Sequence, residues 1–177
     1  MNTPGPWFGT KPLPAAGSTI RLRPEQDRDA EFLLRLYLSV RWHELQAIDW
    51  PDESKRAFFA SQFSLQRQQY RESYPGLLRW IVERAAEPVG RLYLLSAAGQ
   101  IRVVDLSLLE SWRGQGIGTV LLKRLRTNAE AQCKPLRLSV LQENPAWHLY
   151  RRLGFQNLSS SGPYQQMEYR AVPLVTD

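Results

Sequence analysis

The chain has 177 residues, a single cysteine and a net charge of +6. A chain of this length most simply forms one domain with its own core, and one cysteine excludes an intrachain disulfide. The sequence has no run of eighteen apolar residues and no signal-peptide pattern at its start, so we expect a cytoplasmic protein without a membrane span.

Residues 1–17 contain four prolines and three glycines, which predicts a flexible or extended arm ahead of a domain over residues 18–177. Strands and helices are then predicted from apolar periods of two and of three to four residues. In chain order we expect a strand at 19–23, a helix from Asp27 or Asp29, a helix after 51–54 that ends at 74–76, strands at 77–83 and 89–95 joined by 84–88, a strand at 101–109, a helix at 116–132, a strand at 136–141, a helix at 144–153, and a hairpin of 155–158 with 164–170. The prediction is a mixed α/β chain of about seven strands and four helices.

The most informative stretch is Arg-Gly-Gln-Gly-Ile-Gly at 113–118, between a predicted strand and a predicted helix. Backbone N–H groups at such a helix start favour an anion, usually a phosphate. The stretch lacks the Gly-Lys-Ser/Thr end of a P-loop, and its G-x-G-x-G spacing differs from the Rossmann fingerprint. A glycine-rich connection without a ligand remains the alternative at this point.

A second informative stretch covers residues 144–155 and predicts a short helix with both ends marked. Asn144 suits the N-cap, Pro145 suits the first helical position, and Gly154 suits the residue after the end. A strand-like run precedes this helix. A strand followed by a helix is therefore predicted twice, first around the glycine-rich turn and then at residues 136–153.

Together the two stretches resemble the motifs of the GNAT superfamily of N-acetyltransferases. The acetyl-CoA signature of that family, Arg/Gln-x-x-Gly-x-Gly/Ala, is matched by Arg113, Gly116 and Gly118. Its second signature is matched by Asn144, Ala146, the pair Leu149–Tyr150 and Leu-Gly-Phe at 153–155, with an Asn-to-Tyr spacing one residue shorter than in many members.

The resemblance implies the GNAT fold, in which a mixed, mostly antiparallel sheet is flanked by the four helices. It implies that the fourth and fifth predicted strands splay apart to admit the pantetheine arm of acetyl-CoA, the acyl donor. No metal is expected, because the two histidines and the single cysteine show no ligand spacing. The implied cofactor-binding residues are Leu106, Ser107, Leu108, Arg113, Gly114, Gln115, Gly116, Ile117, Gly118, Thr119, Asn144, Ala146 and Tyr150.

Three residues are candidates for the chemistry itself. Tyr150 is implied as the proton donor to the departing thiolate, although it could instead only pack its helix against the sheet. The backbone N–H of Leu108 is the implied oxyanion donor. Asp105 is a candidate general base or a structural carboxylate paired with an arginine. The other candidate bases are Glu44, Glu83, His43 and a relayed water.

The segment 41–50 joins the first two predicted helices, and in the family this connection borders the acceptor pocket. Trp42 and Glu44 are therefore candidate acceptor-binding residues, while Trp42 and Trp50 could equally fill the core beneath the loop.

The expected partner is an amine, carried by a small molecule or by a protein. The acetyl group would pass directly from acetyl-CoA to this primary amine within a ternary complex. The alternative function is a non-catalytic CoA-binding sensor or assembly module. Nucleic acid is not the expected partner because the basic residues form no block, and a homodimer is left open.

Overall fold

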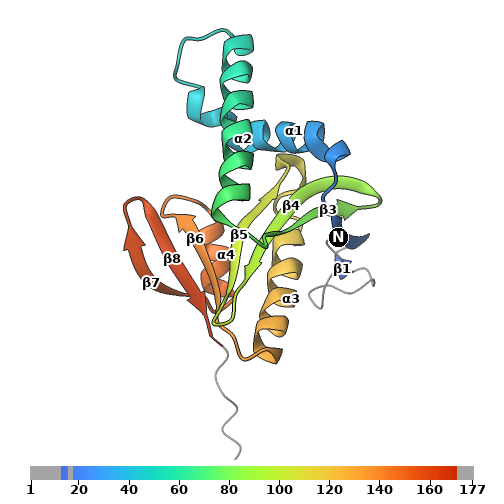
Figure 1. Cartoon of the computed structure of the whole chain (residues 1–177), viewed down its shortest axis with the longest axis vertical. Helices are drawn as coiled ribbons and strands as arrows, with labels where there is room; N and C mark the ends of the chain where they lie inside the picture. The colour runs from blue at the N-terminus through green and yellow to red at the C-terminus, as the bar shows by residue number, and fades with distance from the viewer. Residues whose placement is uncertain (1–12, 16–17, 171–177) are drawn as a thin grey trace, which may run out of the picture.

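The computed structural model describes residues 13–15 and 18–170, which form a single sheet with helices on both faces (Figure 1). The helices are α1 (Ala30–Arg41), α2 (Asp52–Ser73), α3 (Ile117–Ala131) and α4 (Ala146–Arg152), with short 3₁₀ turns at Asp27–Asp29, Trp42–Leu45 and Glu110–Trp112. The strands are β1 (Leu13–Ala15), β2 (Ser18–Pro24), β3 (Leu78–Arg84), β4 (Glu87–Ser96), β5 (Ile101–Leu108), β6 (Leu136–Leu141), β7 (Gln156–Ser161) and β8 (Tyr164–Tyr169).

The strand order is β1-β2-β3-β4-β5-β6-β8-β7, and every neighbouring pair is antiparallel except β5 and β6. Parallel neighbours need a crossover connection, and here α3 supplies it. The predicted mixed, mostly antiparallel sheet flanked by four helices is confirmed.

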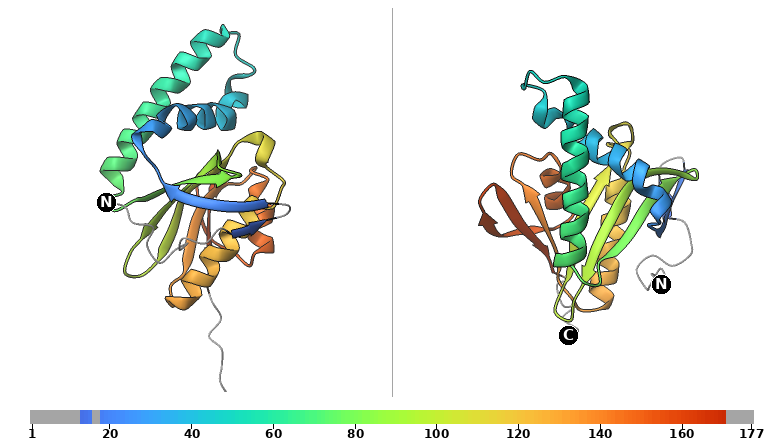
Figure 2. Two further views of the ribbon diagram at one scale, coloured as in Figure 1. Left: turned by 90° about the vertical axis from the view of Figure 1, so that its right-hand side faces the viewer. Right: turned by 45° about the horizontal axis from the view of Figure 1, so that its top comes forward.

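The sheet lies between α1 and α2 on one face and α3 and α4 on the other (Figure 2). An apolar core lies on each face. The larger core joins the sheet to α3 and α4, and the stripe of Ile117, Leu121, Leu125 and Ala129 on α3 is at most 1% exposed. The smaller core joins α1 and α2 to the opposite face, where Ile81 of β3 meets apolar residues of both helices. Burial on both faces explains the long apolar runs of β3 and β4.

The sheet contains one strand more than the seven expected. The additional strand, β1, lies at an edge, where Pro14 is tolerated because it needs no ladder partner on its outer side. The rest of the predicted arm, at residues 1–12 and 16–17, lies outside the described residues. The connection expected at 84–88 is also shorter, because Ala85 and Ala86 form a tight turn with both φ angles positive.

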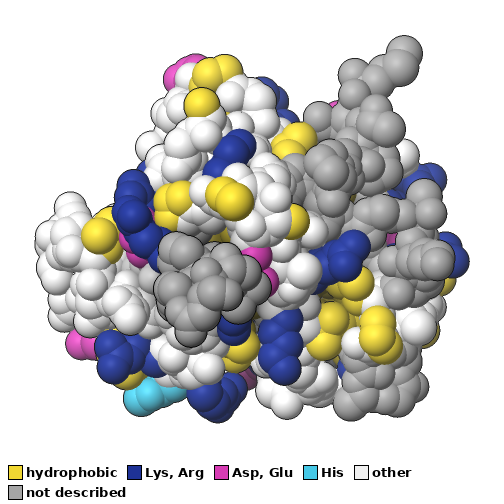
Figure 3. All heavy atoms as spheres, turned by 90° about the horizontal axis from the view of Figure 1, so that it is seen from below, with side chains coloured by type: hydrophobic (Ala, Val, Ile, Leu, Met, Phe, Trp, Pro, Cys, Tyr) yellow, Lys and Arg dark blue, Asp and Glu magenta, His cyan; other side chains and the backbone are white. Residues whose placement is uncertain are grey.

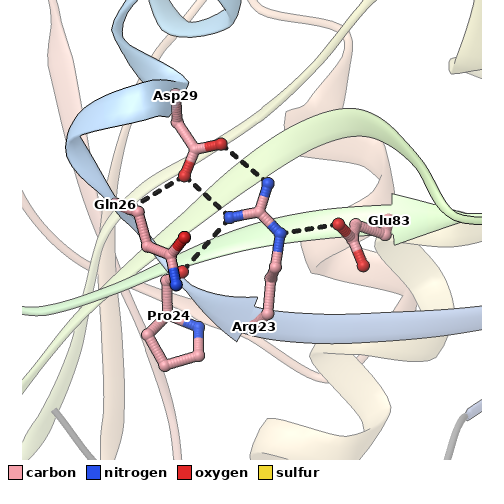
Figure 4. A network of polar contacts seen from close by, with 5 residues as sticks. All are labelled: Arg23, Pro24, Gln26, Asp29 and Glu83. Atoms are coloured by element: carbon pink, nitrogen blue, oxygen red, sulfur yellow. Dashed lines mark hydrogen bonds and ion pairs between the residues drawn. The ribbon is translucent and has the colours of Figure 1, made fainter.

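A polar network fixes the start of α1 against β2 and β3 (Figure 4). The guanidinium of Arg23 donates to both carboxylate oxygens of Asp29 at 2.7 Å and to Glu83 Oε1 at 2.6 Å. The backbone N–H of Gln26 donates to Asp29 Oδ2 at 2.8 Å. Asp29 is only 4% exposed, so its carboxylate depends on these donors in place of water.

We expect Asp29→Asn to lower the free energy of unfolding by roughly 1.5–3 kcal/mol at neutral pH. The hydrogen bonds from Arg23 hold the pKa of Asp29 below its ordinary value, despite burial. A lowered folded pKa stabilises the protein fully above the unfolded value of about 3.9, and that contribution is lost as the pH falls through the folded pKa. Urea denaturation between about pH 2 and pH 7 measures the difference.

The control is Asp27→Asn, because Asp27 lies in the same 3₁₀ turn but is exposed. That variant should match the parent across the whole range. Equal stability of Asp29→Asn and Asp27→Asn at neutral pH would contradict the role given to the network.

Candidate active site

The glycine-rich turn lies between the end of β5 and the start of α3. Gly114 and Gly116 adopt φ angles of +72° and +80°, which residues with a Cβ rarely adopt. Gly116 directly precedes α3, and its carbonyl accepts the N–H of Val120 at 3.0 Å. The first N–H groups of α3 have no acceptor within the helix, so the turn presents donors at the positive end of the helix dipole.

The side chains of the turn brace it from within. Arg113 Nε donates to the carbonyl of Leu108 at 3.0 Å, and Gln115 lies between Ser111 O at 2.7 Å and Arg84 at 2.5 Å. These contacts leave the backbone as the principal donor surface of the turn. An ideal Cβ at Gly114 or Gly116 would meet no atom within 4 Å, so the protein itself does not fill the space beside them.

The next three predicted cofactor residues differ in what they present. The side chain of Ile117 belongs to the core, and Thr119 is half-buried. A Cβ added to Gly118 would lie 3.5 Å from a methyl carbon of Leu149. Gly118 therefore faces Leu149 of α4 with room for an ordinary van der Waals contact, and Ile117 can offer a ligand only its backbone.

The sheet opens between β5 and β6. The two strands pair only over Ile101–Val103 and Leu136–Leu138, although β5 continues to Leu108 and β6 to Leu141. This is the splay that the resemblance implied. It ends beside the glycine-rich turn, which begins directly after β5.

The register of β5 determines which backbone groups face this opening. Leu109 N–H donates to Val89 O at 2.9 Å, and Ser107 pairs with Arg91 in the same register. Because antiparallel pairs alternate, Ser107 and Leu109 direct their backbone groups toward β4, whereas Leu106 and Leu108 direct theirs toward the opening. The backbone N–H of Leu108 therefore faces the side on which β6 has separated.

Tyr150 lies on α4, on the side of the sheet that α3 also covers. Its side chain is 9% exposed, and its ring packs edge-on against Phe155 with 5.8 Å between centroids. Burial raises the pKa of Tyr150 to about 12, and the negative charge of Asp105 adds to the effect. The phenol thus keeps its proton throughout the physiological range.

Asn144 and Ala146 stand at the start of α4. Asn144 Oδ1 accepts the N–H of Ala146 at 2.9 Å, as an N-cap side chain does, although the regular helix begins only at Ala146. The Asn144 side chain is thus engaged by its own helix, and Ala146 packs against the larger core.

Asp105 is held by partners on two other elements. Its Oδ2 pairs with Arg91 of β4 at 2.6 Å and lies 3.5 Å from the hydroxyl of Tyr70 on α2, while its Oδ1 accepts from Ser107 Oγ at 2.6 Å. Of the two roles that the sequence left open for Asp105, the structure shows the ion pair with an arginine.

A cavity of about 90 Å³ lies between α1, α2 and the sheet. Asp105 and Ser107 contribute to it from β5, next to the residues whose backbone faces the opening. Its full lining is Leu36, Tyr37, Val40, Arg41, Gln66, Arg91, Asp105 and Ser107.

The predicted acceptor-binding residues Trp42 and Glu44 do not line this cavity. Glu44 pairs with Arg41, which does, at 2.7 Å. Trp42 packs against Phe59 of the smaller core with 6.2 Å between ring centroids, whereas Trp50 is 45% exposed. The core-filling alternative therefore describes Trp42 and does not describe Trp50.

The remaining candidate bases lie apart from the cavity. Glu83 is bound to Arg23 in the network at α1, and His43 is exposed. The sequence-based reasoning also missed a residue of the cavity, Arg91. Its signal was available, because Arg91 is the single charged residue in the apolar run 89–95.

Neither a metal-binding cluster nor a membrane-spanning helix is found among the described residues. Within residues 13–15 and 18–170, no group of three or more His, Cys, Asp or Glu side chains is arranged to hold a metal ion. In that same part of the chain, the helices are too short or too polar to cross a membrane.

Residues 76–157 match the family model described as an acetyltransferase (GNAT) domain. This span contains both motifs, the opening between β5 and β6, and Tyr150. Over these residues the chain therefore matches the GNAT acetyltransferase family, and its fold is the GNAT fold.

Solved structures share the fold over most of their length. The PaiA N-acetyltransferase of Thermoplasma acidophilum, in complex with coenzyme A, is 19% identical with a TM-score of 0.64, over 86% of this chain and 99% of that one. RimJ of Mycobacterium smegmatis, in complex with CoA-disulfide, is 22% identical with a TM-score of 0.61, over 94% and 88%. An acetyltransferase of Thermus thermophilus is 21% identical with a TM-score of 0.64, over 91% and 100%.

Proposed function

We propose that this protein transfers an acetyl group from acetyl-CoA to a primary amine, directly within a ternary complex. The observation that carries the proposal is the continuity of the opening between β5 and β6 with the glycine-rich turn at the start of α3. The strand edge can pair with an extended pantetheine arm, and the turn can bind the pyrophosphate.

The residues at this place fit such a ligand. Backbone N–H groups from Gly114 to Thr119 would hold the pyrophosphate, and Leu106 and Leu108 would pair with the arm. Ser107, Arg113 and Gln115 would support these segments through their contacts. When bound, acetyl-CoA supplies an acetyl group activated as a thioester.

The transfer forms a C–N bond and breaks the C–S bond. The N–H of Leu108 would stabilise negative charge on the carbonyl oxygen. Tyr150, which retains its proton, would deliver it to the departing sulfur. The amine would lose its proton to a carboxylate or to water. Asp105 is the carboxylate that lines the cavity, but it is already paired with Arg91, and water is therefore the favoured proton acceptor.

The domain would extend over residues 18–177, and the acceptor would enter from the side of α1 and α2. On the face shown in Figure 3, the basic side chains are dispersed among neutral and acidic ones, so this face does not favour nucleic acid.

Titration with acetyl-CoA and free CoA, followed by an assay of CoA release across a panel of amines, tests the function. Binding with transfer supports the proposal. Binding without transfer to any amine supports the alternative of a non-catalytic CoA-binding module. Absence of binding would contradict both functions.

We expect Gly116→Ala to weaken CoA binding at least about tenfold, because alanine resists the left-handed conformation that directs the amides of the turn. Isothermal titration calorimetry measures the dissociation constant. The control is Gly162→Ala in the β7–β8 turn, where φ is +57° and the added Cβ likewise meets no atom within 4 Å.

Both variants should lose similar stability, but only Gly116→Ala should lose affinity. Unchanged CoA affinity in Gly116→Ala would remove the turn from the binding site.

A further inference from the structure

The cavity beside β5 contains a buried cation that is not fully satisfied. Arg91 is 3% exposed, and its Nη2 donates to Asp105 Oδ2 at 2.6 Å and to Gln66 Oε1 at 3.0 Å. Its Nε is buried and has no hydrogen-bond partner. A buried donor without an acceptor is destabilising, and such donors are rare in folded proteins.

Tyr37 offers a second donor to the same cavity. Its hydroxyl oxygen accepts a hydrogen bond from Arg41 Nη1 at 2.6 Å, so the hydrogen of that hydroxyl remains available. The other two nitrogens of Arg41 are bound to Glu44. Arg91 Nε and the Tyr37 hydroxyl are therefore two donors without an assigned acceptor.

Ser107 supplies a hydrogen-bond acceptor to the same cavity. Its hydroxyl donates to Asp105 Oδ1 at 2.6 Å, and its lone pairs remain free to accept from an amine. Ser107 and Asp105 belong to β5, in which Leu108 turns its backbone toward the opening. The acceptor side of the cavity is thus the side nearest the proposed acetyl group.

The charges around the cavity decide between kinds of amine. Two guanidinium groups, from Arg41 and Arg91, line it with one carboxylate, that of Asp105, and Glu44 pairs with Arg41 from outside. A polyamine would add positive charge where no carboxylate is unpaired. A molecule that carries both an amine and a carboxylate would leave the charge balanced and would supply the missing acceptor.

We propose that the acceptor is an amino acid in the chemical sense, an amine with a carboxylate close by. Its carboxylate accepts from the Arg91 guanidinium and the Tyr37 hydroxyl, and its nitrogen lies at Ser107. At about 30 Å³ for each water molecule, the cavity holds only this amine and carboxylate end, so the remainder of the acceptor lies outside it. This inference rests on the proposed function.

The test compares glycine, β-alanine, L-alanine and L-phenylalanine with their primary amides and with the amines that lack the carboxylate. CoA release is measured at equal concentrations of unprotonated amine, and kcat/KM is compared within each set. We expect at least one acid to exceed its amide by about tenfold or more, as for a hydrogen bond to a charged group.

Two variants assign this preference to the cavity. Arg91→Lys keeps the charge and removes Nε, and Tyr37→Phe removes only the hydroxyl. Each should lower the acid-to-amide ratio of kcat/KM at least about threefold, whereas a purely structural effect would lower both values by the same factor. Tyr37→Phe preserves the aromatic packing with Phe59 and Phe63, so it serves if Arg91→Lys does not fold.

The control is Arg71→Gln, an exposed position on α2 that should retain the parent ratio. Transfer to amides and simple amines as efficient as transfer to the acids would overturn the inference and leave the proposed function standing. If no amine accepts acetyl, the proposed function fails, and calorimetry with the same acids and amides in the presence of CoA decides the inference separately. Acids that bind no more tightly than their amides would then overturn it.

Discussion

Replacing Gly90 with alanine should both destabilise the protein and reduce acetyl transfer more than tenfold. An ideal Cβ at Gly90 would lie 2.3 Å from the carbonyl oxygen of Ser107 and 2.5 Å from a methyl carbon of Leu108. The first of these contacts is with backbone, which cannot rotate away, so β5 must move. The peptide group that would move joins Ser107 to Leu108, and its N–H, that of Leu108, faces the proposed acetyl group.

The expected loss of stability lies at or above the upper end of the roughly 1–3 kcal/mol that overpacking produces. For a chain of this size it corresponds to a fall in Tm of roughly 5–10 °C. Thermal unfolding and steady-state kinetics at a temperature well below both transitions separate the two effects.

Gly99→Ala is the matched control, because Gly99 lies in the loop before β5 and an added Cβ there meets no atom within 4 Å. Its stability and turnover should stay close to those of the parent. A Gly90→Ala protein with parental kcat would show that the position of β5 does not govern the chemistry.

Tyr150→Phe should lower kcat by about 10²–10⁴-fold, the usual contribution of a general acid, with little change in CoA affinity. The ring remains available to pack against Phe155, so only the hydroxyl is lost. Because burial raises the pKa of Tyr150 to about 12, the donor stays protonated in any ordinary assay. Loss of its proton should therefore not cause the alkaline limb of the parent pH–rate profile below about pH 11.

The measurements are kcat across pH 6–10 and the dissociation constant of CoA for both proteins. Tyr169→Phe is a suitable control, because Tyr169 also packs against Phe155 but its hydroxyl hydrogen-bonds to Arg126 and Glu130 of α3. Equal kcat for Tyr150→Phe and the parent would remove Tyr150 from the reaction and restore its alternative role in packing.

The glycine turn and the helix after it could be predicted from the sequence because their signals are local. Gly114 and Gly116 occupy conformations that only glycine adopts readily, and the apolar stripe of α3 repeats at helical spacing. The opening between β5 and β6 was reached differently, through the resemblance carried by two motifs. No periodicity in either strand reports where their pairing stops.

Features that depend on distant partners could not be predicted. Asp105 had two open roles because its partner, Arg91, lies on the neighbouring strand, and only the register brings them together. The hairpin between β3 and β4 was predicted with too long a connection, because alanine is not a residue that tight turns favour. The strand β1 was assigned to an arm because proline and alanine carry little strand propensity.

The pairing of β5 with β6 over only three residue pairs divides the backbone ladder into two half-sheets, β1–β5 and β6–β8. A small rotation of one half against the other changes the width of the gap without breaking the ladders inside either half. A ligand that bonds to both β5 and β6 would link the two half-sheets across this gap. Its binding free energy would then also oppose the separation of the two half-sheets.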